Sequence, residues 1–243
     1  MKLELTNHNI LKAAFESITN IVDEITMTAD DEGLHLRSLD KSHITFITMD
    51  LKKELFDTYE CEDKETFAID CTEFTKMLKK GKPSDRLELE LTSEELYIIF
   101  KGDATRTFKI LFVDMEYDSP VPPTIEHPCS VRIPSDLLKT YINDMEDFNE
   151  SLTFIVDEDY LRIKSEGQMG AAEIEYLHGE NITSVVRSNF SIPKLQDMLK
   201  ASKFSKECIL DIGEDMPLKL RMELVTGDGF IEYLLAPRLE QED

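Results

Sequence analysis

The sequence predicts an α+β protein built from two similar domains, each with two helices backed by antiparallel strands. Three observations predict this class. Short segments recur in the same order roughly 125 residues apart. Apolar residues within each copy follow helical spacing in some stretches and strand alternation in others. A proline-rich stretch separates the copies. At 243 residues the chain has room for two such domains.

The internal repeat depends on five matches that are individually weak. Residues 33–38 match 160–165, 67–70 match 190–193, 77–80 match 198–201, 87–91 match 208–212, and Gly102 matches Gly227. Their constant order indicates two copies of one fold. Between the copies lie three prolines in four residues, at positions 120–123, which do not suit a helix or sheet interior. We therefore place the domains at 1–117 and 128–243, with a connector at 118–127.

The elements of the first copy follow from periodicity and turn residues. Apolar side chains three and four apart predict a helix at 10–21, and Asn9 is a candidate cap. Acidic and glycine residues at 30–33 predict a turn between two strands. In chain order, the predicted elements are a helix at 10–21, strands at 25–29, 34–38 and 44–51, a helix at 72–80 and a strand at 87–91.

The second copy repeats this pattern. Helical spacing at 137–145 follows Pro-Ser-Asp at 134–136, and a second helix is predicted at 192–201. Gly227-Asp228-Gly229 lies between apolar strands, which is typical of a hairpin turn. A nucleotide-binding glycine loop would need a strand before it and a helix after it. The strand-rich pattern with two helices per copy supports the α+β class.

Composition excludes several classes of protein. The hydrophobic content of 41% is too high for a fully disordered acidic chain. The longest apolar run, 96–100, is far shorter than a membrane span of about 20 residues. The N-terminus lacks a secretory signal, so we expect a cytoplasmic protein. A net charge of −23 argues against coating nucleic acid with the whole surface.

Residues with catalytic or metal-binding potential are scattered. The motifs of P-loops, serine hydrolases and zinc proteases are absent from the sequence. The four cysteines lack metal or redox spacing, so we interpret them as buried thiols. Acid pairs such as Asp157 and Asp159 lie beside turns, although a hydrolase using such a pair stays as an alternative. We expect no catalytic residue, no metal and no cofactor.

The basic residues gather at matching places in the two copies. Residues 75–86 and 194–206 are net basic in an otherwise acidic chain. Lys76, Lys79 and Lys80 share a helix face, since neighbours on a helix are three and four residues apart. Such a face either keeps the protein soluble or contacts a phosphate backbone. Without interleaved aromatic residues it would bind phosphates without reading bases.

Several motifs resemble the sliding clamps of the proliferating cell nuclear antigen (PCNA) family. They are Gly-Leu-His-Leu-Arg-Ser-Leu-Asp-Lys-Ser-His-Ile at 33–44, Phe-Asp-Thr-Tyr-Glu-Cys at 56–61, Asp-Met-Pro-Leu at 215–218 and Leu-Leu-Ala-Pro-Arg-Leu-Glu at 234–240. Ala-Thr-Arg-Thr-Phe-Lys at 104–109 and the proline-rich joint resemble the archaeal branch. The resemblance covers the chain from residue 1 to about residue 240.

The resemblance implies a DNA clamp fold that assembles as a homotrimer into a pseudo-sixfold ring. Such a ring encircles double-stranded DNA without sequence specificity. It tethers DNA polymerase and other replication and repair proteins, such as flap endonuclease and ligase, through short client peptides. A separate ATP-dependent clamp loader would open it, because this sequence lacks a P-loop. The alternative is a monomeric acidic interaction scaffold that does not encircle DNA.

In such a ring the helices line the central hole. The resemblance therefore implies that DNA is faced by Lys12, Lys76, Lys79, Lys80, Lys194 and Lys200. Lys139 is a poorer candidate, because this chain has Thr140 and Asn143 where relatives can carry arginine.

Clients of the family insert a short helical plug below the connector. The resemblance implies a client-peptide pocket formed by Leu39, His43, Ile44, Val121, Pro122, Pro217, Leu234, Leu235, Ala236 and Pro237. Leu234 stands where many relatives have tyrosine, so we expect a more aliphatic rim.

The ring seam in relatives pairs an edge strand from each domain, here 105–113 and 171–178, with Ile110, Ile174 and Tyr176 on them. We add a hypothesis about charge across this seam. Basic residues near the first edge would oppose acidic residues of the second domain, namely Lys80, Lys82, Arg86 and Lys109 against Asp136, Asp144, Glu146 and Asp147. Each exposed pair would contribute at most about 1 kcal/mol, and Lys80 and Lys82 would divide between seam and DNA.

Overall fold

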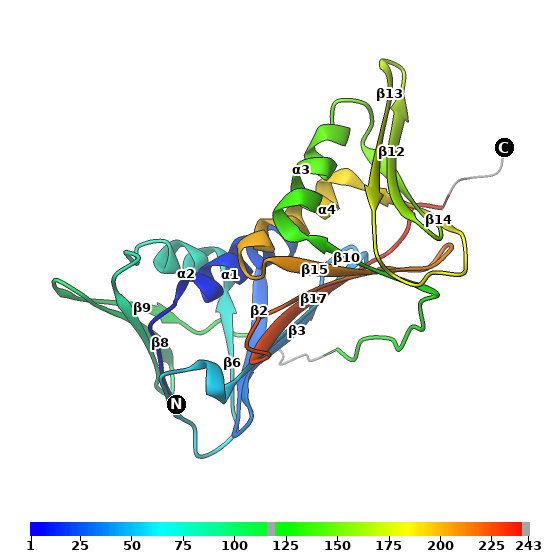
Figure 1. Ribbon diagram of the computed structural model, residues 1–243. Coiled ribbons are helices and arrows are strands. Elements are labelled where there is room, and N and C mark those ends of the chain that lie inside the picture. The colour runs from blue at the N-terminus through cyan, green and yellow to red at the C-terminus, as the bar shows by residue number, and fades with distance from the viewer. Residues whose placement is uncertain (116–119, 240–243) are drawn as a thin grey trace.

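The computed structural model describes residues 1–115 and 120–239, which form two halves of like architecture (Figure 1). The predicted joint at 117–118 therefore lies outside the described residues. The first half contains, in order, β1 (Lys2–Leu5), α1 (Asn9–Ile21), β2 (Glu24–Ala29), β3 (Gly33–Leu39), β4 (Thr45–Lys52), the 3₁₀ turn η1 (Lys53–Leu55), β5 (Thr58–Glu60), β6 (Glu65–Asp70), α2 (Cys71–Leu78), β7 (Arg86–Leu91), β8 (Glu95–Lys101) and β9 (Thr105–Leu111).

The second half repeats this order of helices and strands without counterparts of η1 and β5. It contains β10 (Cys129–Pro134), α3 (Ser135–Met145), β11 (Ser151–Val156), β12 (Tyr160–Gly167), β13 (Gly170–Leu177), β14 (Val186–Ser191), α4 (Ile192–Met198), the 3₁₀ segment η2 (Leu199–Lys203), β15 (Glu207–Ile212), β16 (Leu218–Glu223) and β17 (Gly229–Leu235). The described strands all pair antiparallel, so the predicted α+β class and internal repeat are confirmed.

The strand order makes the repeat explicit. Strands β1-β7-β8-β9 of the first half correspond to β10-β15-β16-β17 of the second, and β4-β3-β2-β6 correspond to β13-β12-β11-β14. One pairing joins the halves: β17 runs antiparallel to β4, from Gly229 opposite Leu51 to Leu235 opposite Thr45. The two four-stranded units on either side thereby form one eight-stranded sheet.

The core continues across this junction. Tyr233 of β17 is fully buried, and its hydroxyl is 2.8 Å from the Ser17 hydroxyl of α1. Burial raises the pKa of the Tyr233 phenol, which keeps it neutral and able to donate this hydrogen bond. The C-terminal strand is therefore tied to the first helix by packing and by a polar contact.

The four helices lie together on one side of the molecule, between the β8–β9 and β12–β13 hairpins (Figure 1). Helix α1 buries its apolar stripe, and Phe15 meets Phe74 of α2 edge to face at 4.6 Å. Within the described chain, no helix is long and apolar enough to cross a bilayer.

Two local predictions about helix ends need correction. Asn9 is the first residue of α1, and the cap is His8, whose side chain makes no capping hydrogen bond. His8 is instead fully buried with its ring against Phe100 at 5.6 Å, so packing determines where this helix begins. The helix predicted at 192–201 ends at Met198 and continues as η2.

Candidate functional site

The predicted DNA-facing lysines lie on the helix layer and differ in their contacts. Lys12 is half-buried on α1. Lys76 lies 3.5 Å from Glu73, and Lys79 of the α2 C-terminus lies 3.9 Å from Glu16 of α1. These pairs are exposed and long, so they leave both ammonium groups available to phosphates.

Lys200 lies 2.7 Å from Asp197, one turn earlier on the same face. Lys80 differs, because its ammonium lies 5.5 Å from the centre of the Phe108 ring of β9. A cation over an aromatic face is held there by the ring quadrupole. The structure therefore places Lys80 at the β9 edge of the molecule.

Lys194 makes a contact that the sequence does not predict. Its ammonium lies 3.0 Å from Asp40 of the other half of the chain, and its side chain is only 29% exposed. Asp40 is 3% exposed, so this is a largely buried ion pair between the halves. Lys194, which the sequence predicts to face DNA, therefore also ties α4 to the β3–β4 loop.

Asp40 organises that loop through several hydrogen bonds. One carboxylate oxygen accepts from the amides of Ile44 and Thr45 at 2.7 and 2.8 Å, and the other accepts from the Ser42 hydroxyl at 2.5 Å. Burial disfavours the charged form, but the hydrogen bonds from Ser42, Thr45 and Lys194 outweigh it and lower the pKa of Asp40. The loop keeps His43 in the left-handed region, at φ 58°.

The loop presents apolar side chains beside the C-terminal tail. Leu39 and Ile44 are 37% and 39% exposed. The Ala236 amide donates to the Ile44 carbonyl at 2.9 Å, so the tail continues the β17–β4 pairing past the strand ends. Ala236 and Pro237 are half-buried beside this contact. The structure thus brings together loop and tail residues of the predicted pocket.

Two of the predicted pocket residues, Leu234 and Leu235 at the end of β17, are buried. Their exposed fractions are only 7% and 1%. Leu235 lies between Leu218 of β16 and Thr45 of β4, and both of these partners are fully buried. The Leu235 side chain therefore faces the core and belongs to the buried cluster.

The connector residues lie on the sheet side of the molecule, away from the helices (Figure 1). Val121 is 82% exposed and Pro122 is half-buried. The end of the connector is fixed by His127, whose ring nitrogen Nε2 lies 2.7 Å from the Pro217 carbonyl oxygen. This contact connects the connector to the predicted pocket residue Pro217.

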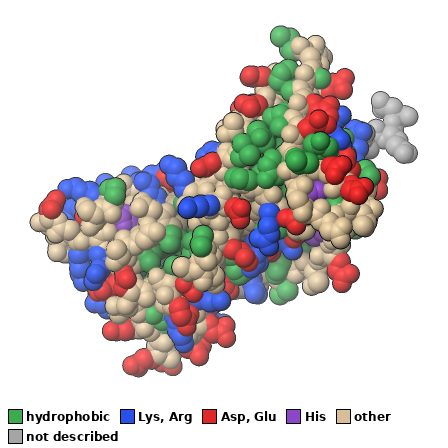
Figure 2. Space-filling view, viewed as in Figure 1, with side chains coloured by type: hydrophobic (Ala, Val, Ile, Leu, Met, Phe, Trp, Pro, Cys, Tyr) green, Lys and Arg blue, Asp and Glu red, His purple; other side chains and the backbone are tan. Residues whose placement is uncertain are grey.

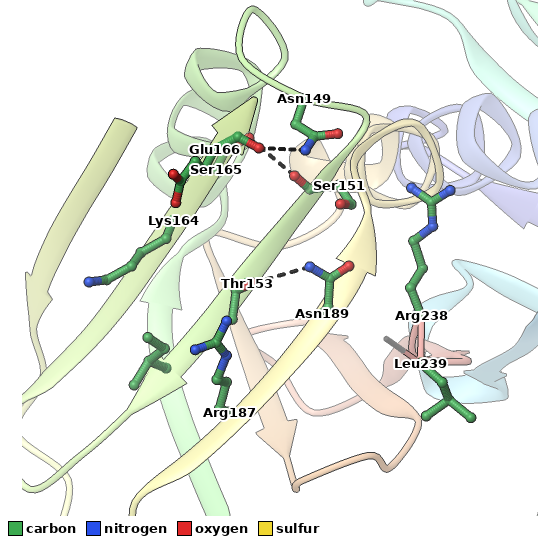
Figure 3. Close-up of a pocket in the computed structure, with 11 residues that line it drawn as sticks. Asn149, Ser151, Thr153, Lys164, Ser165, Glu166, Arg187, Asn189, Arg238 and Leu239 are labelled. Atoms are coloured by element: carbon green, nitrogen blue, oxygen red, sulfur yellow. Dashed lines mark hydrogen bonds between the residues drawn. The ribbon is translucent and has the colours of Figure 1, made fainter. Parts of the chain in front are cut away.

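A polar groove of about 640 Å³ lies beside the tail, on the outer face of β11, β12 and β14 (Figure 3). The Arg238 amide donates to the Asn189 carbonyl at 2.8 Å, which holds the tail along β14. Asn189 also donates from its side chain to the Thr153 hydroxyl at 3.1 Å. These hydrogen bonds hold the tail at Arg238 against β14 and connect Asn189 of β14 to Thr153 of β11.

The predicted seam strands are both sheet edges. β9 ends the five-stranded sheet, and β13 ends the four-stranded sheet. On each strand alternate apolar side chains are half-buried against the core: Phe108 and Ile110 on β9, and Ile174 and Tyr176 on β13. Figure 2 shows hydrophobic side chains gathered on the C-terminal half between the helices and β12.

The charges near these edges are largely paired within the chain. Lys109 lies 2.7 Å from Glu95, Lys82 lies 3.5 Å from Asp103, and Arg86 lies 3.7 Å from Glu4. These ion pairs within the chain would compete with carboxylates of a second chain across a seam. Asp144 of α3 and Asp147 just after it are exposed.

Two contacts at the β9 edge have no signal in the sequence. Arg106 donates to the Lys80 carbonyl at 2.9 Å and pairs with Asp85, which is 3% exposed. Like the Asp40–Lys194 pair, the Arg106–Asp85 pair joins residues that are not close neighbours in the chain. The periodicity of a sequence does not reveal contacts of this kind. Among residues 1–115 and 120–239, no group of three or more His, Cys, Asp or Glu side chains could hold a metal ion.

Comparison with known proteins gives matches over nearly the whole chain. Residues 1–120 match the N-terminal domain of proliferating cell nuclear antigen, and residues 122–238 match its C-terminal domain. A DNA polymerase sliding clamp of Methanobrevibacter smithii is 48% identical over 100% of this chain and 99% of the relative. The DNA polymerase sliding clamp of Methanothermobacter thermautotrophicus is 46% identical over 100% of this chain and 99% of its own length. That of Thermococcus gammatolerans is 33% identical over 92% of this chain and 92% of its own length.

Lys194→Met tests the tie to Asp40. We expect a loss of about 1–3 kcal/mol in the free energy of unfolding, because a buried carboxylate loses a charged donor. Lys200→Met, which removes an exposed pair within one helix turn, should cost under about 0.5 kcal/mol. Urea unfolding at one fixed protein concentration measures both, and equal losses would contradict a special role for Lys194.

The stabilising effect of Asp40 also has a pH dependence. The folded pKa lies below the unfolded value, so this stability is present above the unfolded pKa of about 3.9. It is lost as the pH falls through the folded pKa.

Proposed function

The chain belongs to the proliferating cell nuclear antigen family and is a DNA polymerase sliding clamp, and we propose that it works as a closed homotrimer around duplex DNA. The single observation that supports a ring most directly is the pairing of β17 with β4. The corresponding strands of the opposite halves, β9 and β13, are edges without a neighbour on one side. A second copy can supply the missing neighbour by repeating the same pairing.

Head-to-tail pairing of this kind closes a ring when the rotation from each domain to the next is a whole-number fraction of 360°. Two like halves per chain and three chains give the six units of a pseudo-sixfold ring. Apolar side chains on both edges, such as Ile110 and Ile174, would be buried in the seam. Edge strands left open would expose unpaired backbone groups and favour aggregation, so a closed ring also protects them.

The helix layer is the surface we assign to DNA. Lys12, Lys76, Lys79 and Lys200 lie on it, while the chain as a whole has a net charge of −23. An acidic exterior would repel DNA, so the duplex is guided to the hole. A closed ring holds DNA topologically, and weak phosphate contacts allow it to slide.

The loop and tail surface is where we place the client peptides. Leu39, Ile44, Val121 and the Ala236–Pro237 segment offer exposed or half-buried apolar contacts. Tethering DNA polymerase, flap endonuclease or ligase there would raise its effective concentration at DNA. We propose that the chain is not itself an enzyme, that a separate ATP-dependent loader opens the ring, and that it acts at the nucleoid.

Two further assignments complete the proposal. We divide the chain into domains 1–117 and 128–243 with the connector at 118–127, supported by family matches that end and begin at residues 120 and 122.

Lys80 belongs to the seam rather than to the DNA surface, because its ammonium lies over Phe108 of the edge strand. If the chain acted as a monomeric scaffold, the open edges of β9 and β13, with their apolar side chains, would have no role.

Light scattering on a sizing column tests the ring. We expect a mass near three times the chain mass of 28.0 kDa. Ile174→Asp, which places a carboxylate in the seam, should reduce the mass to that of one chain. Ile209→Asp is the control. Ile209 is also a half-buried isoleucine on a strand, but its strand, β15, lies inside the eight-stranded sheet, so the assembly should be unchanged. A wild-type mass of 28.0 kDa at low and high salt would contradict a self-assembled ring.

Charge reversal on α2 tests the DNA surface. We expect Lys76→Glu combined with Lys79→Glu to weaken duplex binding about tenfold at 0.1 M salt, because two phosphate contacts are lost. Lys52→Glu combined with Lys64→Glu, which changes charge equally at exposed positions outside the helices, is the matched control. Equal effects of the two pairs, measured by retention on nicked circular DNA, would argue against this surface.

Ile44→Asp tests the client surface. A fluorescent plug peptide with two aromatic anchors should bind the variant about 30-fold more weakly, because a hot-spot contact is lost. Val185→Asp alters another exposed apolar residue, 72% exposed, and should leave the dissociation constant unchanged. Fluorescence anisotropy gives both values, and unchanged binding by Ile44→Asp would place the clients elsewhere.

A further inference from the structure

A second groove, of about 680 Å³, lies where the two halves of the chain meet. Its walls come from the start of α1, η1, the residues around the end of η2 and the β16–β17 loop. The apolar lining consists of Leu5, Ile10, Leu55, Phe204, Leu224 and Val225. Val225 is 88% exposed at the rim, whereas Phe204 is 3% exposed.

This junction groove lies at the opposite end of the joining strands from the client surface. β17 begins at Gly229, next to the loop that lines the groove, and ends at Leu235, next to the tail. β4 begins at Thr45, after the client loop, and leads into η1 at the groove. Seven residues of strand span about 20 Å, so the two surfaces are separate.

Polar groups at the groove are left without partners. Lys203 and Lys206 are exposed there, and neither forms an ion pair with a described carboxylate. The Ser202 hydroxyl oxygen is buried in a residue that is 3% exposed, and it has no hydrogen-bond partner within the described chain. A buried hydroxyl without a partner carries a free-energy cost, which a hydrogen bond to a bound ligand would relieve.

The groove lining holds two carboxylates beside its two lysines, and one of the carboxylates is engaged within the chain. Asp57 accepts from the Thr6 amide and hydroxyl at 2.7 Å each. Asp136, in the first turn of α3, is the other carboxylate in the lining. An adjoining depression of about 390 Å³ adds Arg132 together with Glu207 and Glu223, and Glu223 is paired with Arg221 at 2.7 Å. On a chain with net charge −23, this site therefore offers Lys203, Lys206 and Arg132, which have no ion-pair partner among the described residues, beside an apolar floor.

We propose that the junction groove binds a short segment of a partner protein in which apolar side chains lie next to carboxylates. The apolar side chains would fill the floor between Ile10 and Leu224, and the carboxylates would meet Lys203 and Lys206. The Ser202 hydroxyl would pair with a polar group of the bound segment. This site is additional to the client surface, so both can be occupied at once.

Charge and position favour this occupant over DNA and over a second copy of the chain. Duplex DNA offers phosphates for the lysines but nothing that would fill the apolar floor. A second copy would pair through β9 and β13, whereas the groove lies at the β17–β4 junction within one chain. Only the assignment of client peptides to the other surface, which the experiment uses, rests on the proposed function.

A displayed peptide library tests the proposal on the full-length protein. Each peptide carries the fixed pattern acidic–acidic–X–apolar–X–X–apolar, and the plug peptide is present in excess to occupy the client surface. We expect enriched sequences whose dissociation constants rise about tenfold with Val225→Asp and with Lys206→Glu. Val185→Asp and Lys64→Glu, matched changes at exposed positions elsewhere, should leave them unchanged.

Several outcomes would overturn the proposal. They are a library without enrichment, enriched peptides that bind Val225→Asp as tightly as the wild type, and peptides displaced by the plug. An effect of Lys206→Glu on DNA binding with no peptide bound would assign the lysines to DNA instead. Binding of the plug peptide alone is measured separately, so a failed client surface is distinguishable from a failed junction groove.

Discussion

The pairing of β17 with β4 is the interaction on which the rest of this structure depends. It joins two like halves into one eight-stranded sheet, with seven residue pairs between the two strands. It also fixes which edges stay open, because the corresponding strands β9 and β13 keep no neighbour on one side. A chain that satisfies one such junction internally and exposes its two counterparts is suited to closing a ring with copies of itself.

The same junction positions the functional surfaces. At one end of the paired strands lie the β3–β4 loop and the tail, joined by the Ala236–Ile44 hydrogen bond. At the other end lies the junction groove. The helix layer is tied to the first of these surfaces by Lys194 and Asp40. A buried ion pair between a helix and a loop gives that loop a defined conformation, since breaking it would leave a charge buried without a partner.

The sequence predicted the fold well and individual side chains less well. Helix spacing and strand alternation are local properties, so the order of elements and the repeat were readable. The cap of α1 was not, because packing of His8 against Phe100 overrides the preference for asparagine. Leu235 was expected in the client-peptide pocket but is 1% exposed, because its side chain faces the core. The contact between Lys194 and Asp40 was not predicted, because the two residues lie 154 positions apart in the chain.

The sequence by itself determined the α+β class, the two-fold repeat, the proline-rich connector and the basic helices in an acidic chain. These features follow from composition and from spacing between near neighbours, which any fold of the chain must respect. The tertiary structure decided which strands are edges, which lysines keep their charge free and where the apolar junction groove lies. These depend on contacts between residues far apart in the chain, such as Arg106 with Asp85 and Tyr233 with Ser17, and sequence spacing carries no information about them.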